Sequence, residues 1–346
     1  MAIQTTNRQQ FKMGTKPLRF GVLGCSRVAQ KSTIPALLKS DLTSVSAIGS
    51  REIQTAQICA NQFHIDGYGT YTDILGRDDV DAVYLSLPNA LHEEWTMRAI
   101  EAGKHVWCEK PAAMTFSSAR KITDHAKKHG VLVTEGFPFL FHPQHKKVNG
   151  LVSEGAVGDV TTFHGQFSYP MPELGNIRLN LSLGGGIYAD AAVYPIRASR
   201  MIFNEEPESI FCTLIKNAES GVDVKADMVL IFSKNKTAHI SVAFDAYFQS
   251  TYSALGSSGM ISVERAYAVP SDKDTKIFLN RNDETETFNI DATNQFKKFA
   301  ENFASMVGNK EKWTMSANDL LAQTRVFEAG LRSNEEQRVV SIAEIN

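Results

Sequence analysis

Residues 18–30 read "LRFGVLGCSRVAQ", a short apolar run that ends in a glycine and continues into a helix-like pattern. A dinucleotide-binding turn needs a glycine at the strand end, a small residue where the pyrophosphate touches the backbone, and another where helix meets strand. Gly24, Ser26 and Ala29 fill these positions as G-x-S-x-x-A. The Ser26 hydroxyl is able to bond a phosphate, and the N-terminus of the following helix favours an anion. The stretch predicts a dinucleotide-binding turn, with a helix that kinks or restarts at Pro35.

Short apolar runs alternate with longer amphipathic segments from about Leu18 to Phe137. The strand-like runs are "LRFGVLG", "SVSAIG", "DAVYLSLP", "HVWCE" and "VLVTEG", and "WTMRAIEAG" and "ARKITDHAKKHG" are typical of helices. Strand and helix in repetition predict a parallel sheet with helices on both faces. We therefore expect a Rossmann NADP-binding domain over residues 17–137, preceded by a flexible extension over residues 1–16.

The pattern of apolar and polar residues changes after about residue 157, where strand-like runs follow one another closely, such as "DVTTFHGQFSY", "VDVKADMVLIFS" and "KTAHISVAFDA". This pattern predicts an antiparallel sheet, and helical patterns return at 294–308 and 316–337. The expected fold is α/β: the Rossmann domain plus a C-terminal α+β domain over 138–346 with a large, open, mostly antiparallel sheet, the last helices packing back on both domains. Few helices remain to cover that sheet, so we expect a homodimer or homotetramer formed through it.

Composition excludes several classes of partner. The 346 residues carry a formal net charge of −2, which gives no basic footprint for nucleic acid or an anionic membrane. No apolar run approaches the roughly 20 residues needed to span a bilayer, and residues 1–16 lack the apolar segment of a signal peptide. We expect a cytoplasmic protein. Its four cysteines, Cys25, Cys59, Cys108 and Cys212, are far apart and predict reduced thiols and no metal site.

The end of the second predicted strand distinguishes the two nicotinamide cofactors. An acidic residue there would bond the ribose hydroxyls of NAD, whereas a small residue followed by arginine suits the 2′-phosphate of NADP. The strand "SVSAIG" ends at Ser50 and Arg51, which favours NADP(H) over NAD(H). Glu52 keeps open the alternative that Arg51 only solvates a surface turn.

Two further strand ends carry polar side chains, in "LSLPNALHEEW" and "CEKPAAMTF". Ligands of such sheets bind beyond the carboxyl ends of the strands. We therefore expect seven residues to face the cofactor cleft: Leu87, Pro88, Asn89, His92, Glu109, Lys110 and Pro111.

In this order the motifs resemble the glucose-fructose oxidoreductase / inositol dehydrogenase family of NAD(P)-dependent sugar oxidoreductases. The resemblance covers nearly the whole chain from Leu18 and rests on the glycine turn, "LPNALH", "EKP" and "GGGIYADAAVYP" at 184–195. Within the family the chain is most similar to C-3 ketoreductases of nucleotide-linked keto-deoxysugars, through "FLFHPQHKKVNGLVSEGAVGD" and "GSSGMISVERAYAVP". The resemblance implies hydride transfer between NADP(H) and a sugar carbonyl or hydroxyl. Two alternatives stay open: an aldose or trans-dihydrodiol dehydrogenase, and a non-catalytic sensor of NADP(H).

The resemblance also implies roles for individual residues. The catalytic residues are Lys110, Asp190 and Tyr194. The cofactor contacts are Gly24, Ser26, Arg27, Val28, Ser50, Arg51, Leu87, Pro88, Asn89, His92, Glu109, Lys110 and Arg178. The substrate contacts are Lys110, Phe139, His142, Gln144, Arg178, Asp190 and Tyr194. Many relatives carry histidine at the position of Tyr194, so the tyrosine indicates a lysine/tyrosine type of site.

Reduction of a ketone places negative charge on its oxygen, so the site needs a group that donates a proton there. Lys110 and Tyr194 both qualify, and an ammonium close to a phenol lowers the phenol's pKa; we favour Lys110 as the donor. Asp190 and Tyr194 share a helix face, although a helix cap and a core tyrosine are the ordinary uses of such residues. His142 and His145 have the alternative of a polar helix face. We expect Gly184–Gly186 to give clearance for the reacting sugar.

Overall fold

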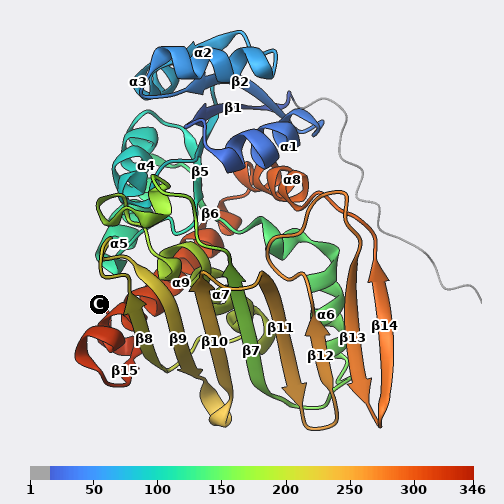
Figure 1. The fold of residues 1–346 in the computed structure, drawn as a ribbon. Helices are drawn as coiled ribbons and strands as arrows, with labels where there is room; N and C mark the ends of the chain where they lie inside the picture. Colours follow the sequence, from blue (N-terminus) through green and yellow to red (C-terminus); the bar gives the residue numbers. More distant parts are fainter. Residues whose placement is uncertain (1–15) are drawn as a thin grey trace, which may run out of the picture.

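A six-stranded parallel sheet forms the first part of the computed structural model, which describes residues 16–346 (Figure 1). Its strands lie in the order β3-β2-β1-β4-β5-β6, the order of a doubly wound dinucleotide-binding domain. The predicted Rossmann fold is therefore confirmed. The strands are β1 (Leu18–Leu23), β2 (Thr43–Gly49), β3 (Gly67–Gly69), β4 (Ala82–Leu85), β5 (His105–Glu109) and β6 (Val133–Gly136).

Helices cover both faces of this sheet, and each face has its own apolar core. The strands are apolar on both sides, as parallel strands between helices must be, and β4 is buried along its whole length. One face carries α3 (Tyr71–Leu75), α4 (His92–Glu101) and α5 (Phe116–His129), and the other carries α1 (Ile34–Leu38) and α2 (Ile53–Gln62). A helix from the far end of the sequence, α8 (Gln295–Val307), completes the second face by packing Phe299 and Phe303 on Trp107.

A π-helical turn follows the glycine turn at the end of β1 and spans Ala29–Thr33. α1 then begins at Ile34 with Pro35 in its first turn, where the missing N–H costs nothing. The predicted restart at Pro35 is confirmed. The same device recurs in the second domain, where a π-helical turn at Tyr188–Ala192 precedes α7 (Val193–Phe203), which contains Pro195. π-helical turns of this kind often lie at functional sites.

A nine-stranded sheet forms the second part, in the order β14-β13-β12-β11-β7-β10-β9-β8-β15. Its pairs are antiparallel except β7 with β10, so the predicted mostly antiparallel sheet is confirmed. The strands are β7 (Val160–Tyr169), β8 (Ser209–Lys216), β9 (Asp223–Ile231), β10 (Thr237–Phe244), β11 (Gln249–Gly256), β12 (Met260–Val263), β13 (Thr275–Arg281), β14 (Glu284–Ile290) and β15 (Val340–Ser341).

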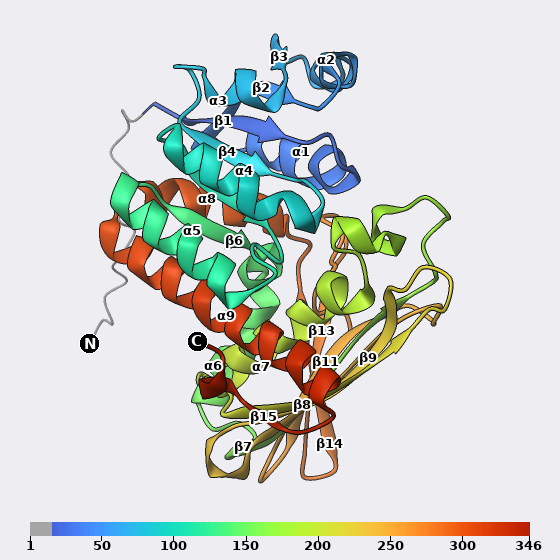
Figure 2. The same ribbon diagram turned by 90° about the vertical axis from the view of Figure 1, so that its left-hand side faces the viewer.

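Three helices pack on one face of this sheet: α6 (Pro143–Ser153), α7 and α9 (Lys310–Glu336). Figure 2 shows the sheet from its side with these helices on one side only. Phe163 and Phe167 of β7 point toward the helices, while His164 and Gln166 alternate with them on the exposed outer face. The long helix α9 joins the two parts, because Leu320 packs in the core of the first sheet and Phe327 in that of the second. Within residues 16–346, no helix is both long and apolar enough to cross a bilayer.

The close approach of α9 to the second domain predicts a stability difference between two glycines. Gly330 of α9 lies against the Tyr188 side chain, whose hydroxyl donates to the main-chain oxygen of Phe327 at 2.9 Å. A methyl group there has no room, so Gly330→Ala is expected to lower the free energy of unfolding by about 1–3 kcal/mol. Gly150→Ala in α6, where nothing lies near the added methyl, is expected to raise it by up to about 1 kcal/mol. Urea unfolding measures both; equal effects of the two substitutions would contradict the packing described.

Candidate active site

An ion pair between Lys110 and Asp190 joins the loops of the two sheets. Lys110 follows the carboxyl end of β5, and Asp190 lies in the π-helical turn before α7. The Lys110 ammonium donates to the main-chain oxygen of Asp190 at 2.5 Å and to its carboxylate Oδ1 at 3.2 Å. The two side chains are only 10% and 18% exposed. This ion pair therefore joins the Rossmann domain to the second domain at the end of β5.

The other oxygen of the Asp190 carboxylate accepts two more donors. Arg178 Nε donates to Oδ2 at 2.8 Å, and the Tyr169 hydroxyl donates to the same atom. Burial alone raises the pKa of Asp190, but the charges of Lys110 and Arg178 and these hydrogen bonds outweigh it and hold that pKa well below its ordinary value. Asp190 is thus an ionised carboxylate on which two cations and a phenol converge.

Tyr169 was not predicted from the sequence. It is the last residue of β7, on the same face as Phe163 and Phe167. Burial, together with the neighbouring Asp190 charge, raises its pKa well above the ordinary value, so the hydroxyl keeps its proton. The alternation of buried and exposed residues along β7, together with the rule that polar residues at strand ends line sites, could have identified Tyr169.

Tyr194 lies beside this network with a free hydroxyl. The Lys110 Nζ atom is 5.0 Å from the centre of its ring, whose edges and faces contact Phe137, Phe139 and Phe167. Among residues 16–346 the hydroxyl has no hydrogen-bond partner, and the residue is half-buried. The expectation that Lys110 lowers the pKa of this phenol is wrong: burial, followed by the charges of Glu109 and Asp190, raises that pKa well above its ordinary value. Tyr194 therefore presents a protonated phenol to the cleft.

The glycine triplet shapes the loop that carries Arg178. A side chain at Gly184, with φ of +76°, would lie 2.9 Å from Cβ of Asn89, and one at Gly185 would lie 2.5 Å from the Arg178 main-chain oxygen. Gly186, with φ of +117°, faces the carboxylate of Asp223 in the same way. The expectation that the triplet gives clearance for a sugar is wrong, because each glycine faces protein. The triplet instead folds residues 176–186 tightly enough to bring the Arg178 guanidinium onto Asp190.

The predicted glycine turn is present at the end of β1, and its contact with a phosphate stays a prediction. Gly24 has φ of +106° and lies against the Ser86 main chain, so only glycine fits there. The Ser26 hydroxyl accepts the Ala29 N–H at 3.1 Å and hydrogen-bonds to the Ser86 hydroxyl, so it also caps the helix start. Arg27 is exposed and Val28 half-buried in that first turn.

The end of β2 offers donors for a phosphate. Ser50 is 8% exposed, and the Arg51 side chain beside it is exposed. Within the part of the chain that the structure describes, the Arg51 guanidinium forms no ion pair, and the adjacent Glu52 does not engage it. A free guanidinium at this strand end fits an adenosine phosphate. No group of three or more His, Cys, Asp or Glu side chains within residues 16–346 is arranged to hold a metal ion.

The loop after β4 touches the second domain. Leu87 is buried and Pro88 half-buried, and Asn89 Nδ2 donates to the Gly184 main-chain oxygen at 2.8 Å. The expectation that His92 faces the cleft is wrong: its side chain is fully buried, with Nδ1 2.7 Å from the Pro111 oxygen and Nε2 2.9 Å from the Leu87 oxygen. His92 therefore lies beneath the cleft and supports its loops.

Glu109 lies just before Lys110 and turns toward the sheet. Its carboxylate accepts the Tyr84 hydroxyl at 2.7 Å, and burial raises the pKa of Glu109. Its predicted contact with cofactor stays a prediction.

The predicted substrate contacts from "FLFHPQHKK" form a buried layer beneath Tyr194. Phe139, His142 and Gln144 are at most 1% exposed, and Gln144 Nε2 donates to the Arg265 oxygen at 2.8 Å. Burial lowers the pKa of His142 to about 4 and that of His145 to about 3, and His145 Nδ1 lies 2.9 Å from the Tyr252 hydroxyl. The alternative of a polar helix face is therefore wrong for both histidines. Substrate contact by Phe139, His142 and Gln144 stays a prediction.

These features define a class: a two-domain oxidoreductase whose Rossmann domain and second domain meet around a lysine, a carboxylate and a tyrosine. Residues 18–137 match the family model for an oxidoreductase family with an NAD-binding Rossmann fold, and residues 145–262 match the GFO/IDH/MocA C-terminal domain. The chain belongs to the Gfo/Idh/MocA family, as its sequence motifs predicted.

Similar proteins act on sugars and related alcohols. The dTDP-3,4-didehydro-2,6-dideoxy-alpha-D-glucose 3-reductase of Actinomadura kijaniata is 34% identical over 313 residues, which cover 90% of this chain and 94% of that protein. The solved structure of a 3-ketoreductase from Actinomadura kijaniata, in complex with NADP and TDP-benzene, has a TM-score of 0.88 with 34% identity and covers 92% of this chain and 98% of its own. The D-xylose 1-dehydrogenase (NADP(+)) 2 of Haloferax volcanii is 29% identical and covers 94% of this chain and all of that protein.

The convergence on Asp190 predicts a large loss of stability when its charge is removed. Asp190→Asn leaves Lys110 and Arg178 close together without their common counter-ion, and we expect the free energy of unfolding to fall by about 3–5 kcal/mol. Because the pKa of Asp190 is held low in the folded protein, the contribution is complete above the unfolded-state pKa, and the loss should be the same at pH 5 and pH 8.

A matched control breaks a more exposed pair. Asp81 and Arg19 form an ion pair with side chains 36% and 40% exposed. Asp81→Asn is expected to cost at most about 1 kcal/mol in the same urea titration. Equal losses from Asp190→Asn and Asp81→Asn would contradict the role given to Asp190.

Proposed function

We propose that this chain is an NADPH-dependent ketoreductase that reduces the C-3 carbonyl of a nucleotide-linked keto-deoxysugar. The observation that carries the proposal is the free Tyr194 hydroxyl beside the Lys110–Asp190 ion pair, at the carboxyl end of β5. The similarity to reductases of dTDP-linked keto sugars supports the substrate class.

The residues at the strand ends suit NADPH. The turn Gly24–Val28 would hold the pyrophosphate, and Ser50 and the unpaired Arg51 guanidinium would hold the 2′-phosphate. Bound there, NADPH would supply the hydride that reduces the carbonyl carbon.

The chain's own residues would stabilise charge and deliver the proton. The Lys110 ammonium already donates two hydrogen bonds to Asp190, which hold it in place as a positive charge close to the developing alkoxide. The Tyr194 hydroxyl is uncommitted, and its raised pKa keeps the phenol protonated at neutral pH. Tyr194 therefore suits the role of proton donor better than Lys110, which the sequence alone favoured. Arg178 and Tyr169 keep Asp190 ionised and oriented.

Two alternatives use the same site differently. An aldose or dihydrodiol dehydrogenase would run the reaction toward oxidation, and relatives with such names are 27–29% identical to this chain. A sensor of NADP(H) would bind the cofactor without turnover and would not need a free phenol beside Lys110.

Two substitutions test the catalytic assignment. Tyr194→Phe removes only the hydroxyl, and we expect kcat for the reduction of a dTDP-linked 3-keto sugar to fall by about 10²–10⁴-fold, with NADPH affinity unchanged. Lys110→Met is expected to lower kcat similarly and to leave NADPH binding intact. NADPH consumption and fluorescence titration measure the two quantities. Full kcat in Tyr194→Phe would contradict its role, and absence of turnover by the wild type on any carbonyl compound would favour the sensor.

The substrate class has a separate test. In the presence of NADPH, thermal-shift measurements with dTDP, UDP and free sugars are expected to show stabilisation by a nucleotide. Stabilisation by free sugars alone would favour the aldose dehydrogenase.

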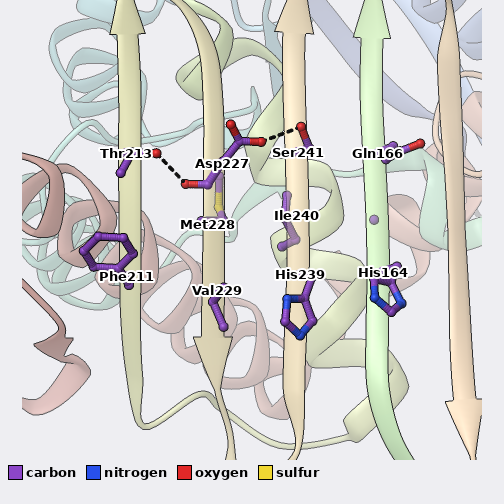
Figure 3. A pocket seen from close by; sticks show the side chains of 11 residues that line it. His164, Gln166, Phe211, Thr213, Asp227, Met228, Val229, His239, Ile240 and Ser241 are labelled. Atoms are coloured by element: carbon purple, nitrogen blue, oxygen red, sulfur yellow. Dashed lines mark hydrogen bonds between the residues drawn. The ribbon is translucent and has the colours of Figure 1, made fainter.

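We also propose that a second copy of the chain covers the outer face of the nine-stranded sheet, giving a homodimer or homotetramer. A pocket lies on this face across β7, β8, β9 and β10, and Figure 3 shows side chains that line it, among them His164, Gln166 and Phe211. Phe211 and Ile215 are 37% and 56% exposed there. A bare face of this kind on an antiparallel sheet is suited to a subunit interface. The predicted cytoplasmic location stays a prediction.

Sedimentation tests the interface. The wild type is expected to be oligomeric at micromolar concentration, and Phe211→Glu to shift it toward monomer. Ile58→Glu, at an equally apolar side chain that is 70% exposed on α2, is the control and should change nothing. A monomeric wild type would contradict the proposed assembly.

A further inference from the structure

The Pro111–Ala112 peptide group, directly after Lys110, is gripped at both ends by side chains from other elements. The Pro111 oxygen lies 2.7 Å from Nδ1 of His92 on α4. The Ala112 N–H donates to Oε1 of Glu135 on β6 at 3.0 Å. His92, Ala112 and Glu135 are 0%, 1% and 7% exposed. Both contacts are buried, so they constrain the backbone that carries the Lys110 side chain.

His92 also contacts the loop after β4, which is the second loop of the Rossmann domain that contacts the other domain. The second nitrogen of His92 lies 2.9 Å from the main-chain oxygen of Leu87, two residues before Asn89. Lys110 and Asn89 each contact the second domain, at Asp190 and at Gly184. One buried ring thus fixes the spacing of the two loops that make these contacts. Burial lowers the pKa of His92 overall, and the two carbonyl oxygens oppose this shift, because each can accept a hydrogen bond from a protonated ring nitrogen.

The buried carboxyl group of Glu135 costs the folded protein stability. Its Oε1 accepts the Ala112 N–H, but its Oε2 is buried and has no hydrogen-bond partner within residues 16–346. A buried carboxyl group with an unpaired oxygen costs stability relative to an apolar side chain of similar size. What the carboxyl group provides in return is the hydrogen bond that it accepts from the main-chain N–H of Ala112, two residues after Lys110.

We propose that Glu135 and His92 are positioning residues for the reaction: they hold the Pro111–Ala112 peptide in a clamp and so keep the Lys110 ammonium on Asp190 and beside the Tyr194 ring. Neither side chain touches the cleft. Their effect on turnover rests on the proposed function, whereas their effect on Lys110 does not.

Two substitutions at Glu135 separate positioning from stability. Glu135→Gln keeps an oxygen that accepts the Ala112 N–H, whereas Glu135→Leu keeps the volume and removes the acceptor. We expect Glu135→Leu to lower kcat by about 10–100-fold, with KM for NADPH unchanged, and Glu135→Gln to stay within about threefold of wild type. All measurements are made well below the melting temperature of each variant.

A readout independent of activity is the rate at which Lys110 is methylated by formaldehyde and a mild reductant, followed by peptide mass spectrometry. We expect Glu135→Leu to speed methylation of Lys110 about tenfold, since misplacement frees the ammonium from Asp190, and Glu135→Gln to leave it slow. Lys104 is the internal control: its ammonium donates to the main-chain oxygens of Arg77 and Val80, away from the clamp, and its rate should not change.

The outcomes are distinguishable. A lower melting temperature of Glu135→Leu with unchanged Lys110 methylation and unchanged kcat would overturn the clamp and leave Glu135 a structural residue. Faster Lys110 methylation in Glu135→Leu, in a protein whose wild type reduces no keto sugar, would support the clamp and overturn the proposed reaction instead.

Discussion

The site depends on one buried carboxylate, that of Asp190, which lies outside both the glycine turn after β1 and the end of β5. Asp190 receives Lys110 from the Rossmann domain and Arg178 and Tyr169 from its own domain. Isolated, a carboxylate buried to this degree would take up a proton. Surrounded by two cations and a phenol it stays ionised, and in return it fixes all three. The interface between the domains is therefore organised around a charge that requires both domains to be in place.

Local backbone devices make this convergence possible. The π-helical turn at Tyr188–Ala192 places Asp190 at the start of α7, and the preceding glycines allow the loop to fold back so that Arg178 meets it. The same combination of a glycine turn, a π-helical turn and a proline shapes the end of β1. In both places a polar group lies at the start of a helix, beside the end of a strand.

Apolar periodicity was sufficient to predict the fold because most strands are buried on at least one face. It missed the short strands β3 and β15, of three and two residues, and the hairpin of β13 and β14, whose second strand, "ETETFNI", is largely exposed at the sheet edge. The motifs identified Lys110, Asp190 and Tyr194, since their chemistry is carried by residue type. Tyr169 and Glu135 were missed because their roles depend on strand pairing and register. His92 was assigned to the cleft because a motif gives the loop of a residue but not the direction of its side chain.

In the proposed reaction, the arrangement divides the work of catalysis between a fixed charge and a transferable proton. An ammonium that donates twice to a carboxylate keeps its charge in a fixed place, which stabilises a developing alkoxide without reorganisation. A phenol without a partner, kept protonated by burial and by two nearby carboxylates, gives up its proton only when stronger negative charge forms beside it. The same raised pKa that makes Tyr194 a poor acid in the resting protein therefore suits it to an acceptor oxygen that becomes basic during the reaction. In the proposed reaction Lys110 contributes a positive charge in a fixed place, which fits the hydrogen bonds that hold its ammonium on Asp190.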